Sequence, residues 1–219
     1  KAHSPAAARN RGWRAARGAI IAFTYDDCIP EQRWLSTALT AFQQDIAAIS
    51  GRVVTPLTAR PTEHEYTAAQ NIKRDFCAAN CFYRRATLEQ VNGFDETFYL
   101  PWREDSDLYF TLLARHDKCI FLHDAAVMHP VRPVRWGSSI AQQRKTMYDA
   151  LLFKKHPLLY RQHIQRKPQW RNYSIVGALI IALLAAFADV WLLCALALCA
   201  WLIMTLLFAI QRLYRTKHT

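Results

Sequence analysis

The sequence predicts an α/β fold followed by C-terminal transmembrane helices, and three stretches carry this prediction. Residues 19–24 form a short, continuously apolar run that ends in acidic residues, as a buried strand beside a ligand site does. Residues 102–108 hold three carboxylates directly before helix-spaced apolar residues. From Ser174 to Ile210 the only charged residue is Asp189. A soluble α/β domain joined to a membrane segment accounts for all three.

Composition limits the classes of protein. The chain of 219 residues is 52% apolar, which excludes general disorder, and its 28 Lys plus Arg against 17 Asp plus Glu give a net charge of +11. An anionic membrane surface or a phosphate-bearing substrate explains this charge, whereas nucleic acid is disfavoured because no recognised binding motif accompanies it. Of six cysteines only Cys77 and Cys81 are closely spaced in the soluble part. Without a second pair for zinc, we expect buried free thiols in a reducing, cytosolic compartment.

The first elements are well marked. Ser4 and Pro5 open a predicted helix that ends near Gly18, because Ser caps helices and Pro favours their first position. Residues 19–24 should then form a strand covered on both faces in a parallel sheet. Asp26 and Asp27 follow this strand, where open α/β sheets bind ligands, so they are candidates to hold a metal or nucleotide. A polar turn is the alternative.

The middle of the chain should alternate helices and strands. We expect an amphipathic helix over 34–42, two short strands or one bent strand over 46–54, a loop over 55–70, a strand over 75–83 and a short helix over 87–91.

The acidic stretch before the next helix has a simple and a functional interpretation. Carboxylates at a helix N-terminus are favoured by the exposed N–H groups and the helix dipole, and Asp105 or Ser106 is a candidate N-cap. Capping alone explains one or two acids more easily than three. Beyond this helix, 119–122 and 125–128 are expected to be a pair of strands, the second ending at His129. A histidine at that strand end is a candidate third ligand.

Five segments together resemble glycosyltransferase family 2, whose members have the GT-A fold, a mixed sheet flanked by helices. The resemblance runs from Ser4 to about His156, and its segments keep the order and approximate spacing of that family. They are SPAAARNRGWRAARG, IIAFTYDDCIP, AANCFYRRATLEQVNGFDETF, REDSDLYFTLL and AAVMHP. Each segment alone is weak evidence, whereas five in register are highly specific.

The resemblance implies a donor side built around a divalent metal, Mg²⁺ or Mn²⁺. The aspartate motif of the family falls on Tyr25, Asp26 and Asp27, with Asp27 as the metal-side aspartate. His129 matches a histidine that completes the metal shell, and Arg9 is expected with Asp26 on the donor diphosphate. Carboxylates holding a hard cation would stabilise the leaving diphosphate of a nucleotide sugar.

The acidic pair of the family falls on Glu104 and Asp105, with Asp105 in the position of the catalytic base. A carboxylate base suits deprotonation of an acceptor hydroxyl, and a single base without a carboxylate nucleophile implies inversion at the anomeric carbon. Trp102 and Asp107 are expected on the acceptor side, since aromatic faces suit sugar rings; core packing is the alternative for Trp102. The expected partners are a nucleotide-sugar donor, a lipid-linked or glycan acceptor and membrane lipids.

Two other functions stay open. A nucleotidyltransferase would also hold a metal with acids, but such enzymes are typically soluble. An inactive, membrane-anchored binding protein derived from a transferase is the second, because family members often have Asp where this chain has Tyr25.

We divide the chain into a partial catalytic domain, a juxtamembrane connector, a transmembrane hairpin and a basic cytoplasmic tail. The sequence begins with Lys1 rather than Met, so we expect truncation at the N-terminus. The boundaries are 1–136, 137–172, 173–211 and 212–219.

The apolar run is too long for one span. As a single helix it would measure roughly 55 Å against about 30 Å of hydrocarbon, so we expect a hairpin with Asp189 near its outer turn. Basic flanks on both sides place both ends and the catalytic domain in the cytoplasm of a multi-pass inner-membrane protein. An interfacial helix followed by one span is the alternative. In the connector, Arg144, Lys145, Lys154 and Lys155 would bind anionic headgroups, or the helix would simply pack on the domain.

Overall fold

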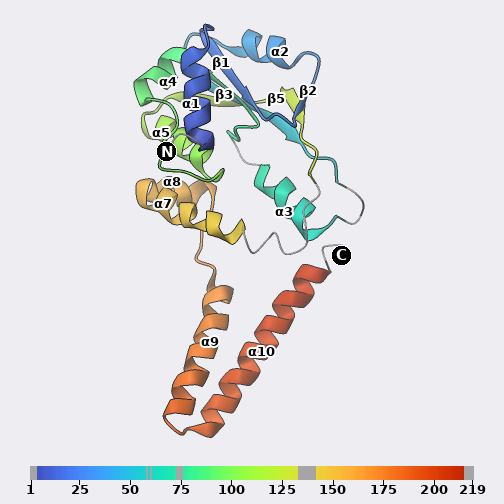
Figure 1. Ribbon diagram of the computed structural model, residues 1–219, viewed down its shortest axis with the longest axis vertical. Helices are drawn as coiled ribbons and strands as arrows, with labels where there is room; N and C mark the ends of the chain where they lie inside the picture. The colour runs from blue at the N-terminus through green and yellow to red at the C-terminus, as the bar shows by residue number, and fades with distance from the viewer. Residues whose placement is uncertain (1–3, 58, 60, 73–75, 133–141, 215–219) are drawn as a thin grey trace. The chain divides into compact units, whose positions relative to one another are not determined.

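A computed structural model describes residues 4–57, 59, 61–72, 76–132 and 142–214. The chain forms two compact units (Figure 1). The first comprises Lys1–Thr58 and His64–Ile164, and the second comprises Ala59–Glu63 and Gln165–Thr219. The sheet and its helices belong to the first unit, and two long apolar helices belong to the second.

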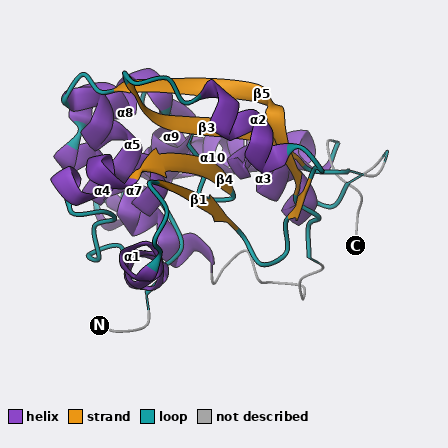
Figure 2. Ribbon diagram, turned by 90° about the horizontal axis from the view of Figure 1, so that it is seen from above, coloured by secondary structure: helices purple, strands orange, loops and turns teal. Residues whose placement is uncertain are grey.

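The first unit is built on a five-stranded mixed sheet, seen from above in Figure 2. Its strand order is β1-β4-β3-β5-β2, with β3 and β5 parallel and the other neighbours antiparallel. The strands are β1 (Ile20–Thr24), β2 (Ile29–Pro30), β3 (Ile46–Val54), β4 (Asn80–Arg84) and β5 (Lys118–Met128). The predicted α/β class with a mixed sheet is therefore confirmed.

Helices cover both faces of this sheet. Successive residues of β4 face opposite sides, so Phe82 joins the cluster of Trp34 and Ile49 while Tyr83 joins the cluster of Trp13 and Leu108. The helical segments of this unit are α1 (Pro5–Ala15), α2 (Trp34–Ala41), α3 (Glu63–Ile72), α4 (Arg85–Val91), α5 (Glu104–Ala114), the 3₁₀ turn η1 (Gln143–Thr146), α7 (Met147–Lys155) and α8 (Pro157–His163).

Several expected elements differ in the structure. The strand β1 pairs antiparallel with β4 at the sheet edge, so the parallel, doubly covered strand was the wrong expectation. Helix α3 occupies part of the expected loop over 55–70. Strand β5 is one strand rather than a pair, and its register against β3 shifts between Gly51 and Arg52. The shift leaves residues 123–125 of β5 without partners in this register, so the irregularity lies in β5, while β3 is one continuous strand.

Local chemistry fixes the ends of α1 and α4. The Ser4 hydroxyl accepts a hydrogen bond of 3.1 Å from the Ala7 amide, as a helix N-cap should, although α1 ends at Ala15 before Gly18. After α4, Gly93 has φ +73°, and a Cβ there would lie 2.4 Å from Asn10 Oδ1. Glycine is therefore required at this turn by both conformation and space.

The connector packs on the domain through its described part. Leu152 of α7 is fully buried and lies with Phe110 and Tyr160 in one apolar cluster. Lys155 Nζ lies 2.6 Å from an Asp95 oxygen and 2.7 Å from an Asp107 oxygen, so the expectation that this lysine is available to headgroups was wrong. Residues 137–141 of the predicted connector lie outside the described residues.

The second unit contains α9 (Trp170–Phe187) and α10 (Trp191–Leu213), which lie side by side (Figure 1). The turn between them holds Asp189 at φ +56°, as expected for a hairpin with this residue at its turn. By length and composition alone, Trp170–Phe187 and Trp191–Gln211 could each cross a membrane. Placement in a membrane stays a prediction, and residues 215–219 of the basic tail lie outside the described part.

Candidate active site

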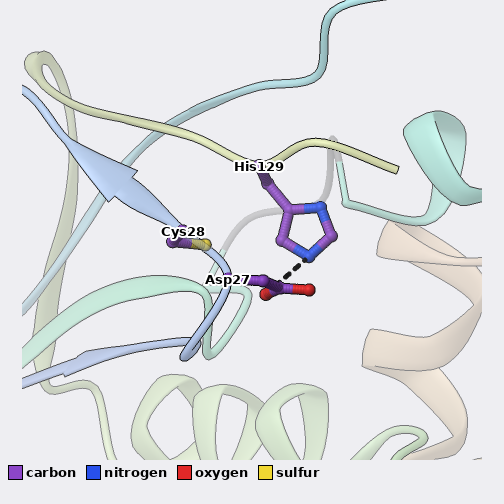
Figure 3. Close-up of side chains that lie close together, drawn as sticks. All are labelled: Asp27, Cys28 and His129. Carbon is purple, nitrogen blue, oxygen red and sulfur yellow. Dashed lines mark ion pairs between the residues drawn. The ribbon is translucent and has the colours of Figure 1, made fainter. Parts of the chain in front are cut away.

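Asp27 and His129 meet at the end of the sheet (Figure 3). Pairing of Ile29 with Met128 places the residues beside this short ladder together, so Cys28 comes next to His129. His129 is itself held in line with β3, because its amide donates a 2.8 Å hydrogen bond to the Val54 carbonyl. Its Nε2 lies 3.4 Å from Asp27 Oδ1. The strand ends therefore bring together two of the predicted ligands, which are far apart in sequence.

The donor atoms of this group are suitable for a divalent cation. One ligand atom each from Asp27, Cys28 and His129 lies within 4.8 Å of the others. Among the described residues, the buried Nδ1 of His129 has no hydrogen-bond partner. Carboxylate oxygen suits Mg²⁺ and Mn²⁺, whereas the soft thiol of Cys28 does not. The Asp27 carboxylate and the His129 imidazole are therefore the groups that could hold such an ion.

Arg132 contacts the carboxylates of both Asp26 and Asp27, which sequence reasoning did not anticipate. Its Nε lies 2.8 Å from Asp27 Oδ2 and its Nη2 lies 3.3 Å from Asp26 Oδ2. The Asp26 side chain is 89% exposed, so its charge is available to solvent and ligands. The signal in the sequence was a basic residue three positions after His129. A cation arriving at Asp27 would compete with this arginine for one of its oxygens.

A second charged cluster lies at the start of α5. Glu104, the first residue of this helix, is 2% exposed and accepts a 2.7 Å bond to Oε1 from Arg9 Nη1 of α1. Burial raises the pKa of the Glu104 carboxyl, and the charge of Asp105 raises it further. Arg9, expected on the donor diphosphate, is thus engaged with Glu104.

Asp105 is fixed by backbone donors. Its Oδ2 accepts from the Ala78 amide at 3.2 Å, and its Oδ1 accepts from the Ser106 amide at 2.7 Å. The N-cap position of α5 is Arg103, at φ +74°, so naming Asp105 or Ser106 as N-cap was wrong. A left-handed conformation costs a residue with a side chain about 1–2 kcal/mol. Other contacts of Arg103 must compensate for this cost.

Tyr25 contacts both clusters. Its ring lies 5.7 Å from the His129 ring on one side, and the Arg9 guanidinium lies 5.7 Å from its centroid. Its hydroxyl lies 3.8 Å from Cys77 Sγ. Burial raises the Tyr25 pKa well above its usual value, with a contribution from the charge of Asp105. Tyr25 thus lies close both to the predicted metal ligand His129 and to Arg9, the partner of Glu104.

The two residues expected on the acceptor side make other contacts. Trp102 Nε1 donates a 3.1 Å hydrogen bond to Asp149 Oδ2 of α7. Asp107 is 3% exposed, and its oxygens lie 2.7 Å from Lys155 Nζ and 3.1 Å from His156 Nε2. Sequence reasoning missed Asp149, although it is the only acidic residue between Asp124 and Asp189.

Comparisons with known proteins agree with this architecture. Residues 1–91 match the family model described as glycosyl transferase family 2. Glycosyltransferase AglE of Haloferax volcanii is 29% identical over 139 residues, which cover 58% of this chain and 44% of that protein. The chain therefore spans less than half the length of this relative. The mannosyltransferase PcManGT from Pyrobaculum calidifontis, solved in complex with GDP-Man and Mn²⁺, aligns with a TM-score of 0.52 at 18% identity, covering 93% of this chain and 67% of that one. At this identity the likeness concerns the fold.

Proposed function

We propose that this chain is a family 2 glycosyltransferase, whose family model matches residues 1–91, and that it transfers a sugar from a nucleotide-sugar donor to an acceptor hydroxyl with inversion at the anomeric carbon. The observation that best supports the proposal is the position of Tyr25, whose ring centroid lies 5.7 Å from both the His129 ring and the Arg9 guanidinium. A donor diphosphate at Asp27 and a base at Asp105 would then both lie near this ring.

On the donor side, Asp27 and His129 would hold a divalent cation, Mn²⁺ or Mg²⁺. When bound, such an ion stabilises the negative charge that develops on the leaving diphosphate. Arg132 would change partners as the donor binds, because its guanidinium can pair with phosphate oxygens as well as with Asp26 and Asp27. GDP-mannose with Mn²⁺ is the first pair to test, since PcManGT was solved with both.

On the acceptor side, Asp105 would act as the general base. Its carboxylate takes the hydroxyl proton while the acceptor oxygen forms a bond to the anomeric carbon. The bond from that carbon to the diphosphate breaks on the opposite side, and its electron pair leaves with the nucleoside diphosphate. Hydrogen bonds from Ala78 and Ser106 fix the orientation of the base. The buried Arg9–Glu104 pair ties α1 to the first turn of α5 and supports that position.

We place the reaction at the cytoplasmic face of a membrane, with a lipid-linked or glycan acceptor. The support is the pair of apolar helices α9 and α10, together with the exposed basic residues of the connector. Trp170 and Tyr173, at the start of α9, are exposed and aromatic, as residues at a membrane interface are.

A nucleotide-binding protein without transfer activity is the second candidate. The observation that favours it is the contact of Arg132 with Asp27, since a permanent ion pair would keep a metal from this carboxylate. Transferase and binding protein differ in one measurable respect. Only the transferase consumes the donor.

The test is release of nucleoside diphosphate by the full chain in nanodiscs, supplied with lipid extract, Mn²⁺ and each of GDP-mannose, UDP-glucose and UDP-N-acetylglucosamine. We expect Mn²⁺-dependent release with one donor, lost on chelation. Asp27→Asn should weaken Mn²⁺ binding, measured by electron paramagnetic resonance, because a neutral amide is a poorer ligand for a hard cation. Asp45→Asn, at an exposed ion pair with Lys118, is the control and should bind Mn²⁺ normally. Nucleotide binding without consumption of any donor would instead favour the binding protein.

A further inference from the structure

We propose that Asp149 of α7 is a positioning residue that holds the strained turn before α5 and thereby places Asp105. This inference rests on the proposed function for its catalytic consequence, while its structural part stands on the contacts alone. No sequence motif marks Asp149, and it lies beyond residues 1–91, which match the family model.

Asp149 bonds to both residues that precede the acidic pair. Its Oδ1 lies 2.6 Å from Arg103 Nε, and its Oδ2 accepts a 3.1 Å hydrogen bond from Trp102 Nε1. The Arg103 side chain is 4% exposed and that of Asp149 is 23% exposed, so water screens the ion pair only weakly. Burial raises the pKa of the Tyr160 hydroxyl of α8, and the charge of the nearby Asp149 raises it further. One side chain of α7 therefore holds both residues of the turn.

The turn needs such a contact because of the Arg103 backbone. At φ +74° and ψ −4° it adopts the left-handed conformation, which residues with a side chain rarely occupy without support. No side chain among the described residues caps α5 at this position. The Arg103 carbonyl nevertheless accepts the first helical bond, at 2.8 Å from the Asp107 amide. If Arg103 left this conformation, the first turn of α5 would reorient.

That reorientation would move the proposed base. Glu104 and Asp105 directly follow Arg103, and the bond from Ala78 to Asp105 depends on where the helix starts. Asp27 and His129, by contrast, are held by the ends of β1 and β5. Loss of Asp149 should therefore impair the acceptor step and leave binding of Mn²⁺ with nucleotide unchanged.

Helix α7 makes other contacts with the domain. They allow a role of Asp149 in positioning Arg103 to be distinguished from simple docking of the helix. The Tyr148 hydroxyl accepts from the Tyr99 amide at 3.0 Å, and Lys155 pairs with Asp95 and Asp107. These contacts hold α7 on the domain without touching Arg103. Lys155→Gln is thus a matched control that removes an ion pair between the same two helices.

The structural arm of the test is hydrogen exchange of the full chain in nanodiscs. Asp149→Asn keeps the size of the side chain but removes its charge, and we expect faster exchange at the Ser106 and Asp107 amides, which are hydrogen-bonded to Asp105 Oδ1 and to the Arg103 carbonyl. Lys155→Gln should leave the Ser106 amide as protected as in the wild type. Exchange at Ser106 and Asp107 in Asp149→Asn that stays within about two-fold of the wild type would overturn the proposal.

The catalytic arm uses the donor that the wild type consumes. Asp149→Asn should lower kcat by about 10-fold to 100-fold, the scale of a small misplacement of a reacting group, with unchanged Mn²⁺–nucleotide affinity. Adding Arg103→Gly should restore part of kcat, because glycine adopts φ +74° without the side-chain cost. A double variant no more active than Asp149→Asn would show that Asp149 only docks α7 and would overturn the positioning role. If the wild type consumes no donor, the proposed function fails, and hydrogen exchange alone decides the role of Asp149.

Discussion

Removing Arg9 should destabilise the domain by leaving a buried carboxyl without its partner. Glu104 is 2% exposed, and Arg9 Nη1 is 2.7 Å from its Oε1. In Arg9→Met the apolar stem is kept while the charge is lost. Breaking a buried ion pair by removing one member costs about 3–5 kcal/mol, because the remaining group must be buried unpaired or protonated.

The lower end of this range applies here. The Arg9 side chain is 15% exposed, so solvent already screens part of its attraction to Glu104. A loss of about 3 kcal/mol corresponds to a Tm decrease of about 6–12 °C for a domain of this size. In the double variant Arg9→Met/Glu104→Gln no charge is left unpaired, so most of the loss should be recovered.

Thermal unfolding of the full chain in detergent, followed by tryptophan fluorescence, measures these differences. Lys118→Met is the control, because Lys118 and its partner Asp45 are 51% and 59% exposed and their ion pair should matter little. An Arg9→Met Tm as high as that of Lys118→Met would refute the reasoning. So would a double variant less stable than Arg9→Met.

Three further predictions follow from the geometry. Burial, together with the charge of Asp105, raises the folded-state pKa of Glu104 above its ordinary 4.5. The contribution of Glu104 to stability is therefore full below pH 4.5 and is lost as pH rises through the raised pKa. Glu104→Gln should flatten this part of a Tm–pH profile, and an unchanged slope would contradict the shift. Gly93→Ala should lower Tm by several degrees, because its Cβ would lie 2.4 Å from Asn10 Oδ1 and 2.6 Å from Trp13 Nε1, and an unchanged Tm would argue against this turn. If α9 and α10 both span the membrane, a reporter that works only in the cytoplasm should be active when it is fused after Thr219. Activity there of a reporter that works only outside the cytoplasm would rule out the hairpin.

The sequence was most informative where a side chain acts on its own backbone. The Ser4 cap and the acids that open α5 are local features, and each lies where the sequence placed it. The pairing of Asp27 with His129 was also predicted from their positions after strands, although β1 and β5 are not neighbours and the ladder of β2 with β5 brings the two residues together.

Pairing partners and long-range charge contacts were beyond the sequence. A buried apolar strand has the same pattern whether its neighbour is parallel or antiparallel, which is why the pairing of β1 was mistaken. Residues 63–72 have little periodicity, and α3 was missed for that reason. Arg103 gave no sign of a left-handed N-cap, because its support comes from Asp149, 46 positions away. Contacts of that kind depend on tertiary packing and have no local pattern.

The central claim is that Asp105 is the base of a sugar transfer, and the most direct measurement is the transfer rate of Asp105→Asn at saturating donor and Mn²⁺. The single asparagine oxygen can still accept one of the two hydrogen bonds, from Ala78 or from Ser106, and the side chain keeps its size, so the fold should survive. We predict a rate lower by about 100-fold or more, the scale of general-base catalysis, with Mn²⁺–nucleotide affinity unchanged. Transfer at close to the wild-type rate would contradict the claim and move the base to another residue.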